Sequence, residues 1–308
     1  MLNKTTISIV IPVYNSEKTL PELLSRLEVV LQEISHNFEV ILVNDGSQDN
    51  SWNIIGQLSQ KYSWMLGINL MRNYGQHNSL LCGIRAAKNE IIVTLDDDLQ
   101  NPPEEIPKLI DKLDEGYDVV YGMPQKQQHG FLRNMASLIT RFTLQTAMGA
   151  ETARKISAFR AFRSRLKVVF VDYQSPTVSI DALLTWGTKH FGAVTVNHVH
   201  RQNGESNYTF RMLLAYALNL MTAFSTLPLQ LSIIIGLFLI LLGALILPYG
   251  LCQYFSMKSV PGFFILVSII VIFSGAQLIA LGVMGEYLAR MHSRLMAKPG
   301  SFSGTSQK

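Results

Sequence analysis

Residues 91–103 read Ile-Ile-Val-Thr-Leu-Asp-Asp-Asp-Leu-Gln-Asn-Pro-Pro. An apolar run typical of a buried strand leads directly into three carboxylates, and a Pro-Pro pair ends the segment. Asp96 and Asp98 are two positions apart, so on an extended backbone their side chains share a face and can reach one cation. Hard oxygen ligands of this kind suit Mg²⁺ or Mn²⁺. The segment therefore predicts a divalent-metal site at the C-terminal end of a strand, although an isolated segment of this composition is also an ordinary acidic turn.

Strand and helix patterns alternate on both sides of this segment. Apolar, β-branched runs predict strands at 7–13, 38–43, 65–70, 91–95 and 118–121, and helical spacing predicts helices that begin at 16–20 and near 49, and that cover 76–87 and 103–113. This alternation indicates an α/β fold with a mostly parallel sheet that is covered on both faces. Several of the strands end in polar residues, and ligands of such sheets bind beyond the carboxyl ends of the strands. A nucleotide site is therefore expected at this edge.

Beyond residue 124 the pattern changes. Residues 131–148 and 210–227 carry apolar side chains at helical spacing, which predicts amphipathic helices that lie along a membrane surface. Two shorter runs, 158–162 and 193–199, have the composition of strands.

The C-terminal part of the chain is strongly apolar, with no Asp or Glu from Ser206 to Gly285. Two stretches in it, 229–251 and 262–285, are long and apolar enough to cross a bilayer as helices. Basic residues follow the second stretch, and such flanks mark the cytoplasmic side of a membrane. The expected organisation is a cytoplasmic domain at 1–205, an interfacial amphipathic helix at 206–228, a two-span transmembrane region at 229–285 and a cytoplasmic basic tail at 286–308.

Composition excludes several other classes of protein. The net charge is only +4, which with the basic tail suits an anionic lipid surface rather than nucleic acid. Cys82 and Cys252 lie on segments that should be well separated, so no disulfide framework is implied. The first residues lack the basic region and long apolar core of a signal peptide. No Gly-x-Gly-x-x-Gly follows the first strand, which disfavours a nucleotide-dependent oxidoreductase.

Six short motifs occur in one order along the chain. They are IPVYN at 11–15, NDGS at 44–47, RNYGQH at 72–77, DDDLQNPP at 96–103, GES at 204–206 and GEY at 285–287. In this order, with two apolar stretches near the C-terminus, they resemble the family-2 glycosyltransferases of GT-A fold, and specifically the membrane-anchored polyprenyl-phosphate glycosyltransferases. Within that family the chain is similar to bactoprenol glucosyltransferases and to undecaprenyl-phosphate 4-deoxy-4-formamido-L-arabinose transferases, and RNYGQH leans towards the latter.

The resemblance implies a role for several residues of the expected site. Asp98 would be the primary metal ligand, with Asp96 touching the metal through water or the ribose of the donor. Asp97 would point to the other face and be structural. Pro12 and Tyr14, at the tip of the first strand, would pack against the base of the nucleotide.

Three further residues have both a ligand-binding and a structural interpretation. Asp45 could accept a hydrogen bond from the base N3–H, but Asn-Asp-Gly-Ser is also an ordinary turn. Arg72 could bind the diphosphate, brace the carboxylates of the site or form a surface salt bridge. His77 is expected to cap or pack the start of a helix rather than to catalyse.

The acceptor site implied by the resemblance lies in the second half of the domain. Relatives carry an Asp, proposed as the catalytic base, where this chain has Ala158. A phosphate monoester has a second pKa of about 6, so as the nucleophile it is mostly ionised at neutral pH and needs no base. The acceptor phosphate does need positively charged side chains that offset its negative charge. Arg160 and Arg201 are the predicted contacts, and Arg163 and His200 are further candidates.

The predicted function is metal-dependent, inverting transfer of a sugar from a nucleotide sugar, expected to be a UDP-sugar, to undecaprenyl or another polyprenyl phosphate. Such a lipid-linked sugar would serve cell-envelope glycan or lipopolysaccharide modification at the bacterial inner membrane. Small residues at 275, 276, 282 and 285 would let helices pack closely and suggest a homo-oligomer. Two alternatives stay open: a glycosyltransferase that acts on a saccharide hydroxyl, and a non-catalytic membrane scaffold. The sequence does not identify the sugar.

Overall fold

The computed structural model describes residues 5–124, 156–174 and 178–199, scattered helical positions between 266 and 291, and the backbone of 303–307. The chain divides into two compact units, one formed by Met1–Leu214 with Ala297–Lys308 and the other by Ala215–Met296. The first unit contains the acidic segment at 96–98.

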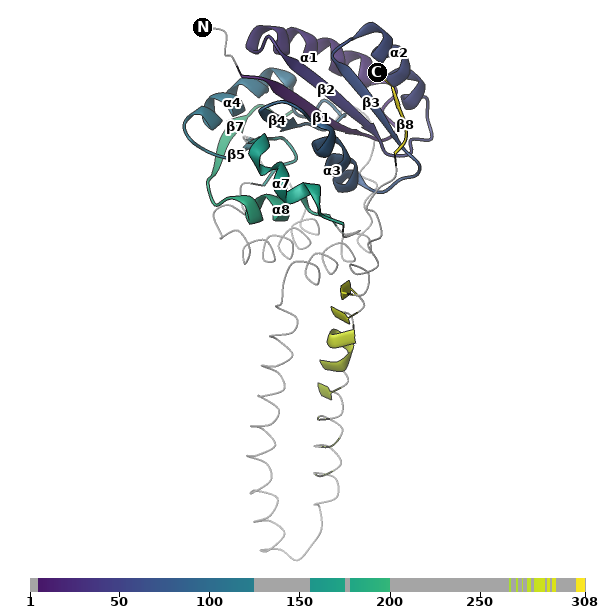
Figure 1. The fold of residues 1–308 in the computed structure, drawn as a ribbon, viewed down its shortest axis with the longest axis vertical. Coiled ribbons are helices and arrows are strands. Elements are labelled where there is room, and N and C mark those ends of the chain that lie inside the picture. The colour runs from purple at the N-terminus through teal and green to yellow at the C-terminus, as the bar shows by residue number, and fades with distance from the viewer. Residues whose placement is uncertain are drawn as a thin grey trace, which may run out of the picture. The chain divides into compact units, whose positions relative to one another are not determined.

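A single sheet of eight strands runs through the described part of the first unit, in the order β7-β5-β6-β4-β1-β2-β3-β8 (Figure 1). The strands are β1 (Ile7–Val13), β2 (Phe38–Asn44), β3 (Met65–Leu70), β4 (Ile91–Thr94), β5 (Val119–Pro124), β6 (Arg160–Arg163), β7 (Phe191–Val196) and β8 (Ser303–Gln307). Parallel pairs join β4 to β1, β1 to β2, β2 to β3, and β5 to β7. β6 is antiparallel to β4 and β5, and β8 is antiparallel to β3. The predicted mostly parallel sheet is confirmed.

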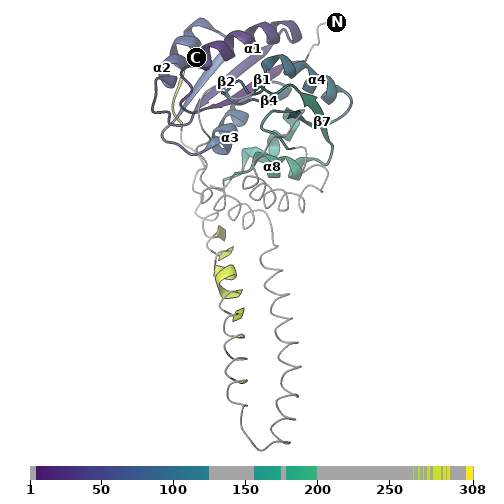
Figure 2. The same cartoon turned by 180° about the vertical axis from the view of Figure 1, so that it is seen from behind.

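Helices cover both faces of this sheet, as Figures 1 and 2 show from opposite sides. The helices are α1 (Leu20–Ile34), α2 (Ser51–Lys61), α3 (Gln76–Ala86), α4 (Ile106–Asp114), α7 (Val168–Val171) and α8 (Ile180–Gly187), with 3-10 turns at Pro103–Glu105 and Ser164–Lys167. Apolar residues of α1, α2 and α4 belong to one buried cluster, and those of α3, α7 and α8 to a second. β1 is buried along its whole length because it lies between the two clusters.

Helix α3 approaches the sheet at a glycine. A Cβ atom built on Gly83 would lie 2.4 Å from Val10 Cγ1 and 3.0 Å from Val43 Cγ2. No side chain fits there unless the Val10 side chain moves or α3 shifts away from the sheet. Because α3 begins at Gln76, beside the acidic segment, this close approach also fixes the height of that helix end above the sheet.

We expect Gly83→Ala to lower the free energy of unfolding by about 1–2 kcal/mol. Overpacking of a core costs about 1–3 kcal/mol, which exceeds the gain of about 1 kcal/mol from replacing glycine inside a helix. Urea unfolding of the purified chain, followed by tryptophan fluorescence, measures the change. An unchanged or raised midpoint would show that α3 can move away from the sheet at no cost.

The structure differs from the sequence-based expectations in three places. First, β6 runs antiparallel between β4 and β5, whereas the strand patterns gave no direction. Second, the helical turns and α8 between 164 and 187 were not expected; Ser179 caps α8 by accepting a hydrogen bond from the Ala182 N–H at 3.4 Å. Third, part of the predicted C-terminal tail at 286–308 belongs to the sheet, because β8 pairs with β3. The sequence of β8 is polar and does not alternate, so it carries no strand signal.

The predicted membrane segments lie mostly outside the described residues. This applies to the amphipathic stretches at 131–148 and 210–227 and to the first predicted span at 229–251. The second, 262–285, is described only at separate helical positions, where Leu266, Ile270 and others have exposed side chains. Within the described positions, no helix has both the length and the apolar character needed to cross a bilayer.

Candidate active site

The acidic segment lies at the edge of the sheet where β1, β2 and β4 end. These strands are parallel, with Val10 opposite Thr94 and Val13 opposite Asn44. Their carboxyl ends therefore meet, and Asp96, Asp97 and Asp98 follow β4 directly. We call these three residues the acidic tip. Its position is the one predicted for the ligand site of an open α/β sheet.

Asp97 ties the acidic tip to the end of β1. Its Oδ2 atom accepts a hydrogen bond from the Tyr14 N–H at 3.0 Å and a second from the Ser16 hydroxyl. Burial raises the pKa of Asp97 to about 6, against these hydrogen bonds, which lower it. The prediction that Asp97 is structural is confirmed.

Asp96 and Asp98 carry the rest of the negative charge. Asp96 Oδ1 accepts a hydrogen bond from Gln76 Nε2 at 2.6 Å, and Asp98 Oδ1 accepts one from the Gln100 N–H at 3.1 Å. Burial and the neighbouring Asp98 and Asp97 charges raise the pKa of Asp96 to about 7. Leu99 has φ 59°, a left-handed conformation that is unusual for a bulky side chain. The tip thus concentrates charge on a strained turn.

The predicted base-binding residues at β1 differ in accessibility. Pro12 is buried inside β1, opposite Val43, so the predicted contact between Pro12 and a base is not available and is corrected. Tyr14 lies just beyond the strand, and 41% of it is exposed. Of the two residues, only Tyr14 can meet a ligand.

Asp45 holds a neighbouring loop in place. Its Oδ1 atom accepts the Tyr74 N–H at 2.7 Å and its Oδ2 atom accepts the Gly75 N–H at 2.8 Å. The next residue, Gly46, has φ 67°, and a Cβ atom there would lie 2.6 Å from the Asn73 nitrogen. Burial raises the pKa of Asp45, although both amides favour the charged form. The structure thus gives Asp45 a loop-bracing role, and its contact with a base stays a prediction.

Arg72 is exposed at the end of this loop. Its guanidinium lies over the Tyr74 ring, 4.8 Å from the ring centroid, which is a cation–π distance. Among the ion pairs of the described residues, none joins Arg72 to a carboxylate of the acidic tip. The structure therefore does not show Arg72 bracing the carboxylates of the site. Its guanidinium is exposed to solvent instead.

Two of the predicted acceptor-phosphate contacts are corrected. Arg160 is 2% exposed, and its guanidinium is paired with Asp181 and hydrogen-bonded to Thr94. It cannot contact an acceptor without leaving this network. Arg163 lies opposite Ile91 because β6 is antiparallel, which places it at the far edge of the sheet beside Asp114.

The remaining acceptor candidates, His200 and Arg201, lie outside the described residues. The last residue before them is described: the Val199 N–H donates to the Gln100 carbonyl at 2.9 Å. The chain therefore reaches the acidic tip just before both candidates. Their role as phosphate contacts stays a prediction.

His77 has a packing role, as predicted, although its partner, α8, was not expected. Its Nδ1 atom accepts a hydrogen bond from the Ile180 N–H at 3.4 Å. Burial lowers the pKa of His77 to about 4, so the imidazole is neutral at physiological pH. Sequence reasoning did not single out Gln76, Gln100 or Asp181. Gln76 had a weak signal, because it opens a predicted helix next to His77.

Comparison with known proteins identifies the class. Residues 8–172 match the family model described as Glycosyl transferase family 2. An undecaprenyl-phosphate 4-deoxy-4-formamido-L-arabinose transferase from Shewanella sediminis (strain HAW-EB3) is 38% identical over 305 residues, which cover 95% of this chain and 90% of that protein. The protein of the same name from Pseudomonas savastanoi pv. phaseolicola (strain 1448A / Race 6) is 36% identical over 300 residues, covering 96% and 89%.

The solved structures that are similar to this chain are more distant in sequence. The crystal structure of a mycobacterial protein has a TM-score of 0.50 at 16% identity, covering 71% of this chain and 73% of that chain. Glucosyl-3-phosphoglycerate synthase from Mycobacterium tuberculosis, in complex with Mn²⁺ and UDP-glucose, has a TM-score of 0.49 at 17% identity, covering 70% and 79%. The family match and the α/β fold define an enzyme of the glycosyltransferase class. The chain belongs to glycosyl transferase family 2.

Proposed function

We propose that this glycosyltransferase moves a sugar from a nucleotide-sugar donor to a polyprenyl phosphate at the bacterial inner membrane. The observation that carries the proposal is the acidic tip at the carboxyl ends of β1 and β4, in a chain that is 38% identical, over 95% of its length, to a protein named as a transferase to undecaprenyl phosphate. A UDP-sugar is the donor we favour, and the exposed residues Tyr14 and Arg72 would meet the nucleotide.

A divalent cation fits the donor set of the tip. Among the described residues, no group of three or more His, Cys, Asp or Glu side chains is arranged to hold a metal ion. Mg²⁺ is commonly bound by only one or two carboxylates together with substrate phosphates, and Asp96 and Asp98 supply that number. Burial, and after it the neighbouring charges of Asp98 and Asp97, raise the pKa of Asp96, and a bound cation would offset the charge of these carboxylates. When bound, Mg²⁺ or Mn²⁺ would offset the charge of the departing nucleoside diphosphate.

The residues around the tip would orient the two substrates. The Gln76 side chain fixes the Asp96 carboxylate, and the Gln100 backbone N–H fixes that of Asp98. Tyr14 and Arg72 would bind the nucleotide. The acceptor phosphate would approach from the side of residue 199, where the chain reaches Gln100. Attack on the anomeric carbon from the face opposite the leaving diphosphate inverts its configuration. Because the nucleophile is already ionised, the Ala158 position needs no carboxylate.

Membrane attachment supports a lipid acceptor. The predicted spans at 229–251 and 262–285 would keep the enzyme beside a substrate whose isoprenoid tail stays in the bilayer. We propose that the catalytic unit and the basic C-terminal part face the cytoplasm, where nucleotide sugars are made, and that the small residues of the second span support a homo-oligomer.

The experiment is a product assay. Purified enzyme with Mn²⁺ and undecaprenyl phosphate is incubated with a panel of nucleotide sugars, and the lipid products are weighed by mass spectrometry. We expect one donor to add a single sugar mass to the phosphate, with the anomeric configuration inverted by NMR. Transfer only to a saccharide hydroxyl, or transfer that persists unchanged in a chelator, would overturn the proposal.

A further inference from the structure

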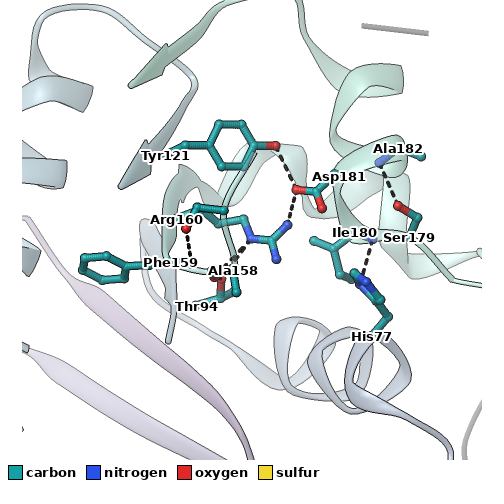
Figure 3. Close-up of polar contacts among 11 residues, drawn as sticks. His77, Thr94, Tyr121, Ala158, Phe159, Arg160, Ser179, Ile180, Asp181 and Ala182 are labelled. Carbon is teal, nitrogen blue, oxygen red and sulfur yellow. Dashed lines mark hydrogen bonds and ion pairs between the residues drawn. The ribbon is translucent and has the colours of Figure 1, made fainter. Parts of the chain in front are cut away.

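A buried polar network surrounds Asp181 (Figure 3). Asp181, in the first turn of α8, accepts a hydrogen bond from the Tyr121 hydroxyl at 3.0 Å and forms an ion pair with Arg160. All three side chains are buried, and Arg160 is among the largest fully buried side chains of the described core. None of them is accessible to a substrate, so their contribution to the reaction has to be indirect.

Arg160 connects Asp181 to the strand that carries the tip. The Thr94 hydroxyl accepts a hydrogen bond from Arg160 Nε at 3.1 Å and donates one to the Ala158 carbonyl at 2.7 Å. Thr94 is the last residue of β4, and Asp96 is two residues further on. The guanidinium thus bridges α8 on one side and the end of β4 on the other, as Figure 3 shows.

A second connection runs through the start of α3. The Ile180 N–H, next to Asp181, donates to His77 Nδ1. The residue before His77 is Gln76, which donates to Asp96 Oδ1 at 2.6 Å. The first turn of α8 is therefore linked to Asp96 by two separate routes, one through Arg160 and one through His77.

Stability alone does not account for an ion pair at this place. A buried pair is often no more stabilising than well-packed apolar residues of the same volume. A directed guanidinium, in contrast, fixes several groups at once because its donors have a rigid fork geometry. Here the fork reaches a carboxylate of α8, a hydroxyl of β4 and, at 3.4 Å, the Ala158 carbonyl.

We propose that Asp181 is a positioning residue for sugar transfer: through Arg160 and Thr94 it holds the end of β4, and with it the carboxylates of the acidic tip, at a fixed place relative to α8. The inference rests on the proposed function of the tip. Reacting groups must be held closely, since a displacement of about 1 Å can cost about 100-fold in rate. Tyr14 and Arg72, which would bind the nucleotide, are not part of the network.

The test compares Asp181→Asn with Thr94→Val and Thr94→Ser, each in the full-length enzyme. Asp181→Asn and Thr94→Val are expected to lower kcat by about 10- to 100-fold while changing the donor KM less than threefold. Thr94→Ser keeps the bridging hydroxyl and is expected to retain wild-type kcat within threefold. The donor is the nucleotide sugar that the wild-type enzyme accepts, with undecaprenyl phosphate as acceptor.

A matched control separates positioning from stability. Asp118 lies just before β5, at the opposite edge of the sheet, and pairs with Arg165 and Thr188. Asp118→Asn also removes a buried carboxylate from an ion pair, although its partner Arg165 is exposed, and it is expected to lower the melting temperature with kcat within twofold of wild type. Equal losses of kcat in Asp118→Asn and Asp181→Asn would overturn the inference, as would a folded Asp181→Asn enzyme with wild-type kcat.

Hydrogen exchange without substrates gives a second readout. Amides of residues 94–100 are expected to exchange at least tenfold faster in Asp181→Asn and Thr94→Val than in wild type or Asp118→Asn. Unchanged exchange there in both variants would contradict the link between α8 and the tip. If wild-type enzyme transfers no sugar to undecaprenyl phosphate while exchange changes as expected, the proposed function fails and the positional link stands.

Discussion

Asp98→Asn is expected to lower kcat for sugar transfer on the order of 1,000-fold and to leave the protein folded. Asp98 is proposed as the primary ligand of the cation that offsets charge on the departing nucleoside diphosphate. An amide keeps the shape of the side chain and can still accept from the Gln100 N–H, but it removes the negative charge. Product formation from the accepted donor, at saturating Mn²⁺, measures the effect.

The same substitution is expected to preserve or raise the melting temperature of the metal-free enzyme. The Asp98 charge contributes to the raised pKa of Asp96, so its removal relieves repulsion within the tip. Asp111→Asn, which removes an exposed carboxylate from α4, serves as the control and should change neither quantity. A large loss of stability in Asp98→Asn, or activity close to wild type, would contradict the assigned role.

The second large effect concerns pH and metal. At pH 8 in a chelator, Asp96→Asn is expected to be more stable than wild type by roughly 2 to 4 kcal/mol, and at pH 5 the difference should fall to less than half of that value. The folded-state pKa of Asp96 is about 7, above its ordinary value of 3.8. The stabilisation associated with the bound proton is therefore full only below about pH 3.8, declines as the pH rises, and is lost above about pH 7. Urea unfolding at both pH values measures the difference.

Comparison with Asp96→Asn cancels an opposing contribution. The pKa of His77 is lowered to about 4, so His77 by itself makes the folded protein less stable as the pH falls below about 6.5. Wild type and Asp96→Asn share this contribution of His77, so it cancels in the difference between them. Saturating Mn²⁺ should stabilise wild type at pH 8, because the ion binds the deprotonated carboxylates. No stabilisation by Mn²⁺ or Mg²⁺ at pH 8 would argue against a metal site at the tip.

Much of the catalytic fold could be predicted because its signals are local. β1 and β4 are continuous apolar runs, and α1 has leucines at helical spacing, so composition and periodicity were sufficient. The acidic tip was also predictable, since parallel strands bring their carboxyl ends to one edge. β8 was not, because its polar sequence forms a strand only through the backbone of β3.

The errors in the site arose where a distant partner decides what a side chain does. From the sequence, Arg160 is a plausible phosphate contact because it is an arginine near the expected acceptor site. Its partner Asp181 is 21 positions away, so the pairing cannot be seen in the local sequence. For Asp45 the role that was missed is loop bracing, because the amides that it binds belong to Tyr74 and Gly75; its contact with a base stays a prediction. Pro12 occupies a motif position and is nevertheless inside the strand. Short motifs identified the region correctly and assigned individual roles less well.

The pairing of β8 with β3 has a practical consequence. With β7 at one border of the sheet, β8 supplies the other, so β3 does not present unpaired N–H and C=O groups to a second molecule. Deletion of Ser303–Gln307 would remove this border and leave β3 unpaired on that side. Aggregation of the shortened protein would then reflect an uncovered strand edge.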